Sequence, residues 1–190
     1  MKLLRYGPKG QEKPGLMDAA GNIRDLSGVV KDIDGAVLSD LSAIKAANVD
    51  TLPVVNAGVR LAEPVAGVGK FICIGLNYSD HAAESGMAEP SEPILFMKAT
   101  SAIIGPYDDV YLPPTSKKGD WEVELGIVIG KTAKYVSKDK ALDYVAGACV
   151  INDLSEREFQ IERQGQWCKG KGCDTFGPFG PYLVTLDEVG

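Results

Sequence analysis

The chain has 190 residues, of which 45% are apolar and 24% are charged, and these values argue against a disordered chain. Its 20 Lys and Arg against 26 Asp and Glu give a formal charge of −6, which argues against nucleic-acid binding because that needs a basic surface. The chain has no run of about 18 apolar residues, so we expect no membrane span. The polar start MKLLRYGPKGQEKPG is not typical of a signal peptide. We therefore expect a cytoplasmic protein that binds neither nucleic acid nor membrane.

The four cysteines include no C-x-x-C pair, and the chain has a single histidine. Zinc sites and disulfide frameworks have a different cysteine spacing and composition, so we expect neither here. We expect reduced thiols, in agreement with a cytoplasmic location. The cysteines are Cys73, Cys149, Cys168 and Cys173.

Residues 1–62 are predicted to form a small N-terminal domain. MKLLRY is typical of a strand, and residues 16–26 predict two short strands around an Ala-Gly-Asn turn. Residues 39–47 predict a short helix because their apolar side chains are spaced for one face. No cluster of polar groups suggests chemistry here, so we expect a structural role.

Residues 63–190 are predicted to form a second unit, in which short strands alternate with helices and loops. Segment 70–76 is typical of a buried strand, and Ser155 with Glu158 predicts a capping box at the start of a helix. The glycine-rich segment 165–181 is expected to be a loop. The strands are expected at 70–76, 94–97, 121–129, 146–151 and 182–185, and the helices within 77–87, 138–144 and 155–164.

The clearest chemical signal lies in WEVELGIVIG. Side chains alternate across a strand, so Trp121 and Val123 share one face while Glu122 and Glu124 share the other, about 7 Å apart. Two carboxylates on one face can share a hard divalent cation. The alternative is a half-exposed strand with a solvated acidic side.

Asp153 follows the apolar strand 146–151, and strand ends often carry functional side chains. Together with Glu122 and Glu124 it would complete an all-oxygen site, which suits Mg²⁺, Mn²⁺ or Ca²⁺ better than zinc or copper. The alternative is a turn or N-cap aspartate before Ser155.

His81 is the only histidine, and Glu84 lies three residues after it in a predicted helix. A carboxylate beside an imidazole raises its basicity and fixes its orientation, as a general base requires. The alternative is an exposed histidine in an intrahelical charge pair.

Residues 165–172 nearly match a phosphate-binding loop, but Gly172 stands where Ser or Thr would contact Mg²⁺. A nucleotide-binding module is therefore one alternative. Lys171 could instead neutralise a carboxylate or a developing enolate, or it could be a surface lysine.

Taken together, these segments resemble the fumarylacetoacetate hydrolase superfamily across nearly the whole chain. The resemblance is closest to the bacterial branch called ureidoglycolate lyase, 2-hydroxyhepta-2,4-diene-1,7-dioate isomerase or 2,4-diketo-3-deoxy sugar-acid hydrolase. Five segments carry it, in the family's order: GLNYSDHAAE, PILFMKATSAIIGP, DWEVELGIVIG, INDLSEREFQ and KGKGCDTFGPFGP.

The resemblance implies the metal ligands and the acid–base pair. The family's E-x-E and Asp ligands fall on Glu122, Glu124 and Asp153, which would bind Mg²⁺ or Mn²⁺. The family's His–Glu pair on a mobile lid falls on His81 and Glu84.

It also implies the remaining site residues and the fold. The active-site lysine falls on Lys171 and the threonine of D-T-F-G-P on Thr175, while Arg157 and Gln160 fall on positions that line the substrate pocket. The fold would be α+β and β-rich, a mixed β-roll behind the small N-terminal domain, and a homodimer is expected. Family members continue well past Gly190, so the resemblance predicts a chain truncated at its C-terminus, with an incomplete core.

The implied reaction is metal-dependent hydrolysis of a C–C bond in a 2,4-dioxo acid, such as an acylpyruvate or a diketo-deoxy sugar acid, through a metal-chelated enolate. His81 would activate water and Lys171 would offset the growing negative charge. The same site would also serve a ureidoglycolate lyase, an oxaloacetate decarboxylase or a dienedioate isomerase. An inactive truncated chain is the remaining alternative.

Overall fold

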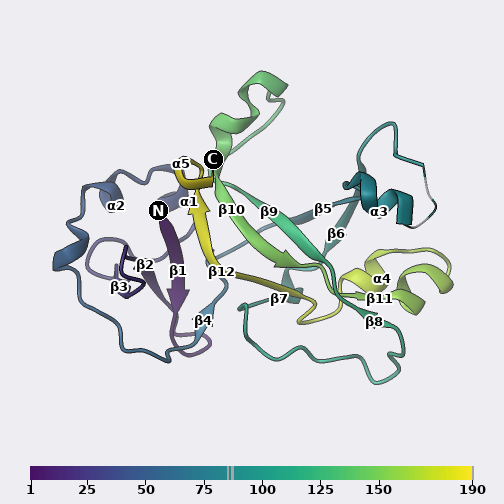
Figure 1. Ribbon diagram of the computed structural model, residues 1–190, viewed down its shortest axis with the longest axis horizontal. Helices are drawn as coiled ribbons and strands as arrows, with labels where there is room; N and C mark the ends of the chain where they lie inside the picture. The colour runs from purple at the N-terminus through teal and green to yellow at the C-terminus, as the bar shows by residue number, and fades with distance from the viewer. Residues whose placement is uncertain (85, 87, 190) are drawn as a thin grey trace.

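The computed structural model describes residues 1–84, 86 and 88–189. Its centre is a sheet with the strand order β3-β2-β1-β12-β10-β9. Strand β1 pairs antiparallel with β12, so the first and last strands lie side by side, purple beside yellow in Figure 1. The bounds are β1 Lys2–Tyr6, β2 Lys13–Met17, β3 Ile23–Asp25, β9 Val123–Ile129, β10 Val145–Asn152 and β12 Gly177–Thr185. The short strands β4 (Leu61–Ala62) and β7 (Ile103–Ile104) join the sheet beside β1 and β12.

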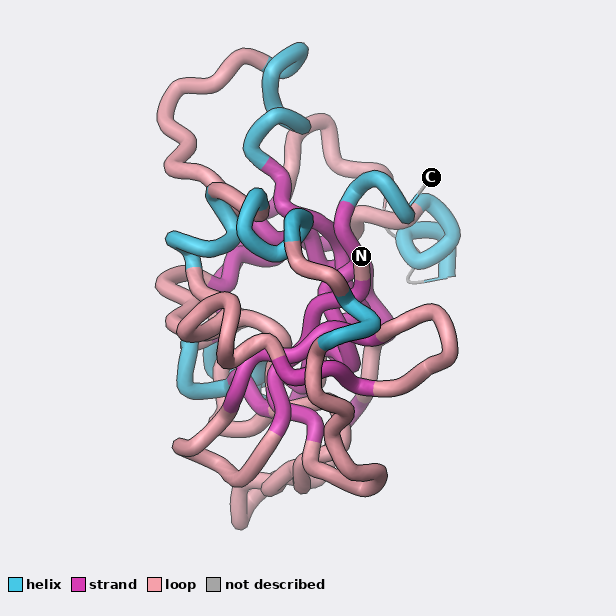
Figure 2. Tube along the Cα trace, turned by 90° about the vertical axis from the view of Figure 1, so that its left-hand side faces the viewer, coloured by secondary structure: helices cyan, strands magenta, loops and turns pink. Residues whose placement is uncertain are grey.

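Two smaller sheets and several short helices surround this centre. Strand β5 (Phe71–Gly75) pairs with β6 (Ile94–Lys98), and β8 (Gly119–Asp120) pairs with β11 (Ser155–Glu156). Figure 2 shows the strands gathered in the middle, with loops and helical turns around them. The helical segments are α1 Gly35–Ser39, α2 Ser42–Ala46, η1 Val49–Thr51, α3 Ser79–Glu84, η2 Thr100–Ala102, η3 Lys138–Tyr144, η4 Glu158–Glu162, α4 Cys168–Lys171 and α5 Leu186–Val189.

The main core forms where the N-terminal segments pack on the central sheet. Leu3 of β1 lies opposite Leu183 of β12, and both side chains are fully buried. Leu26 and Ile33, from the segment that follows β3, complete the same cluster. Burial of such side chains stabilises the fold by about 1.5–3 kcal/mol each.

The predicted α+β, β-rich fold class is confirmed, and most of the predicted strands are present. The division at residues 62 and 63 stays a prediction, although β1 and β12 share one sheet across it. Within the described part of the chain, every helix is too short or too polar to cross a bilayer.

Some local predictions are wrong. The capping box does not form, because Ser155 lies in β11 and its hydroxyl donates to the carbonyl of Asp153 at 3.0 Å. Segment 165–181 is not all loop, since it contains α4 and the start of β12. Strand β5 is not buried: it pairs with β6 in a two-stranded sheet, which leaves Ile72 54% exposed. The helix expected at 39–47 is α2 alone, while Ser39 ends α1.

Strand β9 ends the order of the central sheet and faces solvent with its apolar side. Val123, Leu125, Ile127 and Ile129 are each more than half exposed. The alternation predicted from the sequence is therefore present. The alternative of a solvated acidic side is wrong, because the side of β9 that carries the glutamates is the more buried one.

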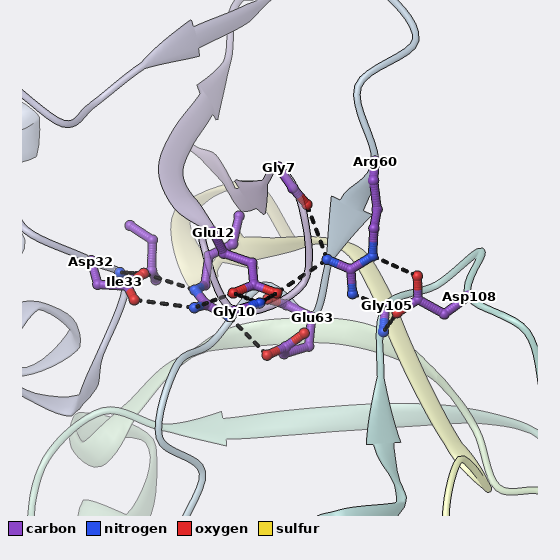
Figure 3. Close-up of polar contacts among 10 residues, drawn as sticks. Gly7, Gly10, Glu12, Asp32, Ile33, Arg60, Glu63, Gly105 and Asp108 are labelled. Carbon is purple, nitrogen blue, oxygen red and sulfur yellow. Dashed lines mark hydrogen bonds and ion pairs between the residues drawn. The ribbon is translucent and has the colours of Figure 1, made fainter.

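An ion network ties the N-terminal strands to the loops around them (Figure 3). Arg5 of β1 donates to Asp32 at 2.7 Å and to Glu63 at 2.8 Å. Arg60 donates to Asp108 at 2.6 Å and to Glu12 at 3.2 Å. These arginines join segments up to 58 residues apart in the chain, so the network fixes the N-terminal strands against the rest of the molecule.

Candidate active site

A cleft of about 1390 Å³ is lined by residues of both β5 and β9. It brings together most of the side chains that the sequence singled out, from four segments of the chain. Those that line it are Glu122, Glu124, Asp153, Arg157, Gln160 and Lys171.

The antiparallel pairing of β9 with β10 places two of the carboxylates next to each other. Asn152 at the end of β10 lies opposite Val123 at the start of β9. The next backbone bond runs from the N–H of Asp153 to the carbonyl of Glu122, at 2.9 Å. Glu122 and Asp153 therefore meet at one end of the strand pair, although 31 positions separate them in the chain.

Lys171 bridges these two carboxylates. Its Nζ donates to Oε2 of Glu122 at 2.7 Å and to Oδ2 of Asp153 at 2.8 Å. The residue is only 3% exposed, so the alternative of a surface lysine is wrong. The alternative of Asp153 as an N-cap is also wrong, because its carboxylate pairs with lysine side chains.

Arg157 and Gln160 form the adjoining wall. Arg157 pairs with Glu122 and with Asp120, and its Nη1 donates to Oε1 of Gln160 at 2.9 Å. Gln160 is 4% exposed. A guanidinium beside a buried amide presents donors in a fixed geometry that suits a carboxylate.

A second lysine, Lys98, was missed by the sequence reasoning. Its Nζ donates to Oδ1 of Asp153 at 2.6 Å and to the carbonyl of Leu154 at 2.9 Å. Burial lowers its pKa, while the attraction of Asp153 opposes that shift. The available signal was alternation along β6, which places Lys98 on the same inward face as Ile94 and Phe96.

Glu124 has a raised pKa, first because burial disfavours its charge and second because Glu122 lies nearby. A hydrogen bond with Tyr78 opposes this shift. The Tyr78 hydroxyl also accepts from the N–H of Leu125 at 3.3 Å. Tyr78, which the sequence reasoning did not single out, therefore connects the segment before α3 to β9.

The position of Lys171 depends on the close packing of α4 against η4. A Cβ on Gly170 would lie 2.3 Å from the carbonyl oxygen of Glu156 and 2.7 Å from the backbone nitrogen of Gln160. Only glycine allows this approach, which brings the end of α4 to the carboxylates.

Three predicted residues are not brought into this cluster by the described contacts. His81 lies on α3, but its side chain is outside the described part of the structure. Glu84 is exposed on the same helix. Thr175 accepts a hydrogen bond from the N–H of Tyr111 at 2.9 Å and does not line the cleft. The catalytic roles of His81 and Glu84 and the substrate-binding role of Thr175 stay predictions.

The donor chemistry of Glu122, Glu124 and Asp153 suits a hard divalent cation, since all the available atoms are carboxylate oxygens. Among the described side chains, however, no group of three or more Asp, Glu, Cys or His is arranged to hold a metal ion. The ammonium of Lys171 lies between two of these carboxylates, Glu122 and Asp153. These three carboxylates are the residues that would hold a metal.

The sequence model of a family described as "Fumarylacetoacetate (FAA) hydrolase C-terminal" matches residues 70–190. The chain belongs to the fumarylacetoacetate hydrolase family. This chain is 63% identical to a protein of Burkholderia lata whose name gives hydrolase and no substrate, over all of this chain and 68% of that protein. A protein of Burkholderia multivorans with a similar name is 62% identical over the same shares.

Solved structures of the fumarylacetoacetate hydrolase family share the fold. Fumarylacetoacetate hydrolase from Exiguobacterium antarcticum has a TM-score of 0.83 and 34% identity, over 98% of this chain and 67% of that one. 5-Carboxymethyl-2-hydroxymuconate delta-isomerase from Mycobacterium smegmatis has a TM-score of 0.72 and 30% identity, over 98% and 66%. These relatives carry hydrolase and isomerase names, so an enzymatic activity of one of these general types is indicated.

Proposed function

We propose that this protein is a metal-dependent enzyme that hydrolyses a C–C bond in a 2,4-dioxo acid. The observation that carries the proposal is the meeting of Glu122, Asp153 and Lys171 in a cleft that Arg157 and Gln160 also line. An acidic pair with a shared ammonium, beside a guanidinium, suits an anionic substrate whose negative charge grows during the reaction.

A divalent cation, Mg²⁺ or Mn²⁺, would be held by Glu122, Glu124 and Asp153 and would supply Lewis-acid polarisation of the 2-oxo acid. The guanidinium of Arg157 and the amide of Gln160 would bind and orient the substrate carboxylate. The ammonium of Lys171 would offset the charge that develops on the leaving enolate.

His81 would take a proton from water, and Glu84 would orient its imidazole. Both residues lie on α3, at the edge of the molecule in Figure 1. The hydrogen bonds of Tyr78 hold the segment before α3 against β9, so α3 would bring the base to the cleft mouth.

A second candidate is isomerisation of a dienedioate, which is favoured by two structural relatives whose names give 2-hydroxyhepta-2,4-diene-1,7-dioate isomerase. A ureidoglycolate lyase and an oxaloacetate decarboxylase would use the same cleft. We further propose the bacterial branch named above as the closest group, a homodimer as the assembly and the cytoplasm as the location.

The test is an activity screen of acylpyruvates, diketo-deoxy sugar acids, oxaloacetate, ureidoglycolate and a dienedioate, with Mg²⁺ or Mn²⁺ and with chelator. Turnover of a 2,4-dioxo acid that chelator abolishes supports the proposal. A folded protein that turns over none of the 2,4-dioxo acids contradicts it, and exclusive turnover of one other substrate selects that alternative.

Two variants sharpen this screen. His81→Ala should lower kcat by about 10²–10⁴-fold, with a much smaller change in KM. Glu122→Gln should weaken Mg²⁺ binding in calorimetry, whereas Glu162→Gln, at an exposed glutamate paired with Lys118, is the matched control and should not. Normal turnover without His81 would remove it from the mechanism.

A further inference from the structure

Two carboxylates that line the cleft, Glu122 and Asp153, are both paired with cationic side chains. Both carboxylate oxygens of Asp153 accept a hydrogen bond from a lysine Nζ, one from Lys98 at 2.6 Å and the other from Lys171 at 2.8 Å. Glu122 is occupied in the same way, by Lys171 at 2.7 Å on one oxygen and by Arg157 on the other. The carboxylates of Glu122 and Asp153 therefore offer no oxygen free of a cation.

The two lysines lie on different sides of Asp153. Lys98 lies within the pairing of β6, is 1% exposed, and has a further bond to the backbone carbonyl of Leu154 at 2.9 Å. Lys171 ends the four-residue helix α4 and lines the cleft itself. Lys98 thus lies behind Asp153, whereas Lys171 lies on the side that lines the cleft.

The ring of Phe96 offers a second binding position for the Lys171 ammonium. The Nζ of Lys171 lies 5.3 Å from the centre of the Phe96 ring, and Phe96 also lines the cleft. An aromatic face attracts an ammonium at this separation. The edge of Trp167 packs on Phe96, with ring centres 5.6 Å apart, and so holds the ring in position.

We propose that Lys171 is an internal counter-ion that competes with the divalent cation for Glu122 and Asp153. When the cation binds, the ammonium gives up its position between the two carboxylates and moves toward the face of Phe96. Lys98 stays in place and keeps Asp153 oriented. This inference rests on the proposed function, since it concerns the same three carboxylates.

The competition has a consequence that can be measured without catalysis. Without a metal, Lys171 compensates two partly buried carboxylates and so stabilises the fold. With a metal, the same lysine weakens binding, because its displacement costs free energy. Removal of Lys171 should therefore destabilise the metal-free protein and strengthen metal binding at the same time.

The experiment is calorimetric titration of MnCl₂ into the full chain and four variants, with melting curves in chelator and in Mn²⁺. Lys171→Met should bind Mn²⁺ at least about tenfold more tightly than the wild type, given the strength of close charge interactions. In chelator it should also have a lower melting temperature than the wild type, and Mn²⁺ should raise its melting temperature by more. Lys171→Gln provides the same test if the Met variant does not fold.

Lys98→Met and Lys118→Met are the controls. Lys98→Met removes a charge from the same aspartate on its buried side and should tighten Mn²⁺ binding less than Lys171→Met does, because the Lys98 ammonium does not have to move when the cation binds. Lys118→Met removes an exposed lysine that pairs with Glu162, and it should change neither readout.

Two results overturn the inference while leaving the proposed function intact. One is Mn²⁺ binding to wild type that Lys171→Met and Lys171→Gln do not tighten. The other is equal tightening by Lys98→Met, which would assign the effect to general charge. No Mn²⁺ binding to wild type or to any variant would instead overturn the proposed metal site, and the inference with it.

Discussion

The ion network of the N-terminal strands and the ion network of the cleft both place cations among carboxylates, but the first is built on arginines and the second mainly on lysines. In the first, Arg5 and Arg60 reach carboxylates on several segments with forked donors. In the second, Lys98 and Lys171 meet at the one carboxylate of Asp153. A guanidinium holds its partners in a rigid geometry, whereas an ammonium is a mobile point charge.

This difference separates a network that holds the fold from one that can exchange partners. None of the residues of the arginine network lines the cleft. In the lysine network, Lys171 and Arg157 line the cleft, while Lys98 lies behind Asp153. The Arg157 guanidinium adjoins Gln160. We expect substitutions in the first to change stability alone, and substitutions in the second to change binding as well.

The largest effect is expected from Arg5→Met. The Arg5 side chain is almost fully buried, so its loss leaves Asp32 and Glu63 without their cation and should lower the free energy of unfolding by about 3–5 kcal/mol. Urea unfolding measures this change. Activity per folded molecule should stay at the wild-type level, and a loss of Mn²⁺ affinity in this variant would show that the two networks are coupled.

Gly170→Ala should have an intermediate effect. A methyl group there would press on the backbone of Glu156 and of Gln160, and such overpacking costs about 1–3 kcal/mol. Because α4 would shift, Lys171 would move away from Glu122 and Asp153. Activity per folded molecule should therefore fall as well as the free energy of unfolding. Gly28→Ala is the control, since nothing lies within 4 Å of a Cβ at that position. Equal changes in both variants would contradict this role for Gly170.

Glu124→Gln should change the pH dependence of stability. The folded state raises the pKa of Glu124 above its ordinary value of 4.5, so folding becomes less favourable as pH rises through that value. The Gln variant should therefore melt higher than wild type at about pH 7 in chelator, with the difference vanishing toward about pH 4. A variant that melts lower at neutral pH would contradict the raised pKa.

Asp108→Asn should show the opposite sign and a smaller change. The hydrogen bond from Arg60 lowers the pKa of Asp108 below its ordinary value of 3.8, so its stabilising effect is present above that value and is lost as pH falls. The Asn variant should melt lower than wild type at neutral pH, and the gap should close in acid. A gap that widens in acid would show that Arg60 does not control this carboxylate.

The candidate site could be predicted in part because its signals are local. Alternation along residues 121–129 places Glu122 and Glu124 on one side, and Asp153 follows an apolar strand. Both signals depend only on near neighbours in the chain. The resemblance to the family then pointed to Lys171, which the structure places beside Glu122 and Asp153.

What could not be predicted depends on contacts between distant segments. Lys98 ends a strand that alone reads as apolar, and its role appears only when β6 packs behind Asp153, 55 residues away. Gly170 looks like one more glycine of a loop until the backbone of Glu156 is found against it. The exposure of β5 likewise follows from its pairing with β6, which its own apolar sequence does not reveal.

Strand β9 also has a consequence for handling the protein. At the end of the central sheet it combines an apolar outer side with backbone groups suited to pairing with another strand, and such edges promote aggregation. The net charge of −6 opposes this by mutual repulsion, and salt screens that repulsion. Concentrated stocks should therefore become turbid as ionic strength rises, and Ile127→Glu, which places a charge on the apolar side and raises the net negative charge, should keep them clear.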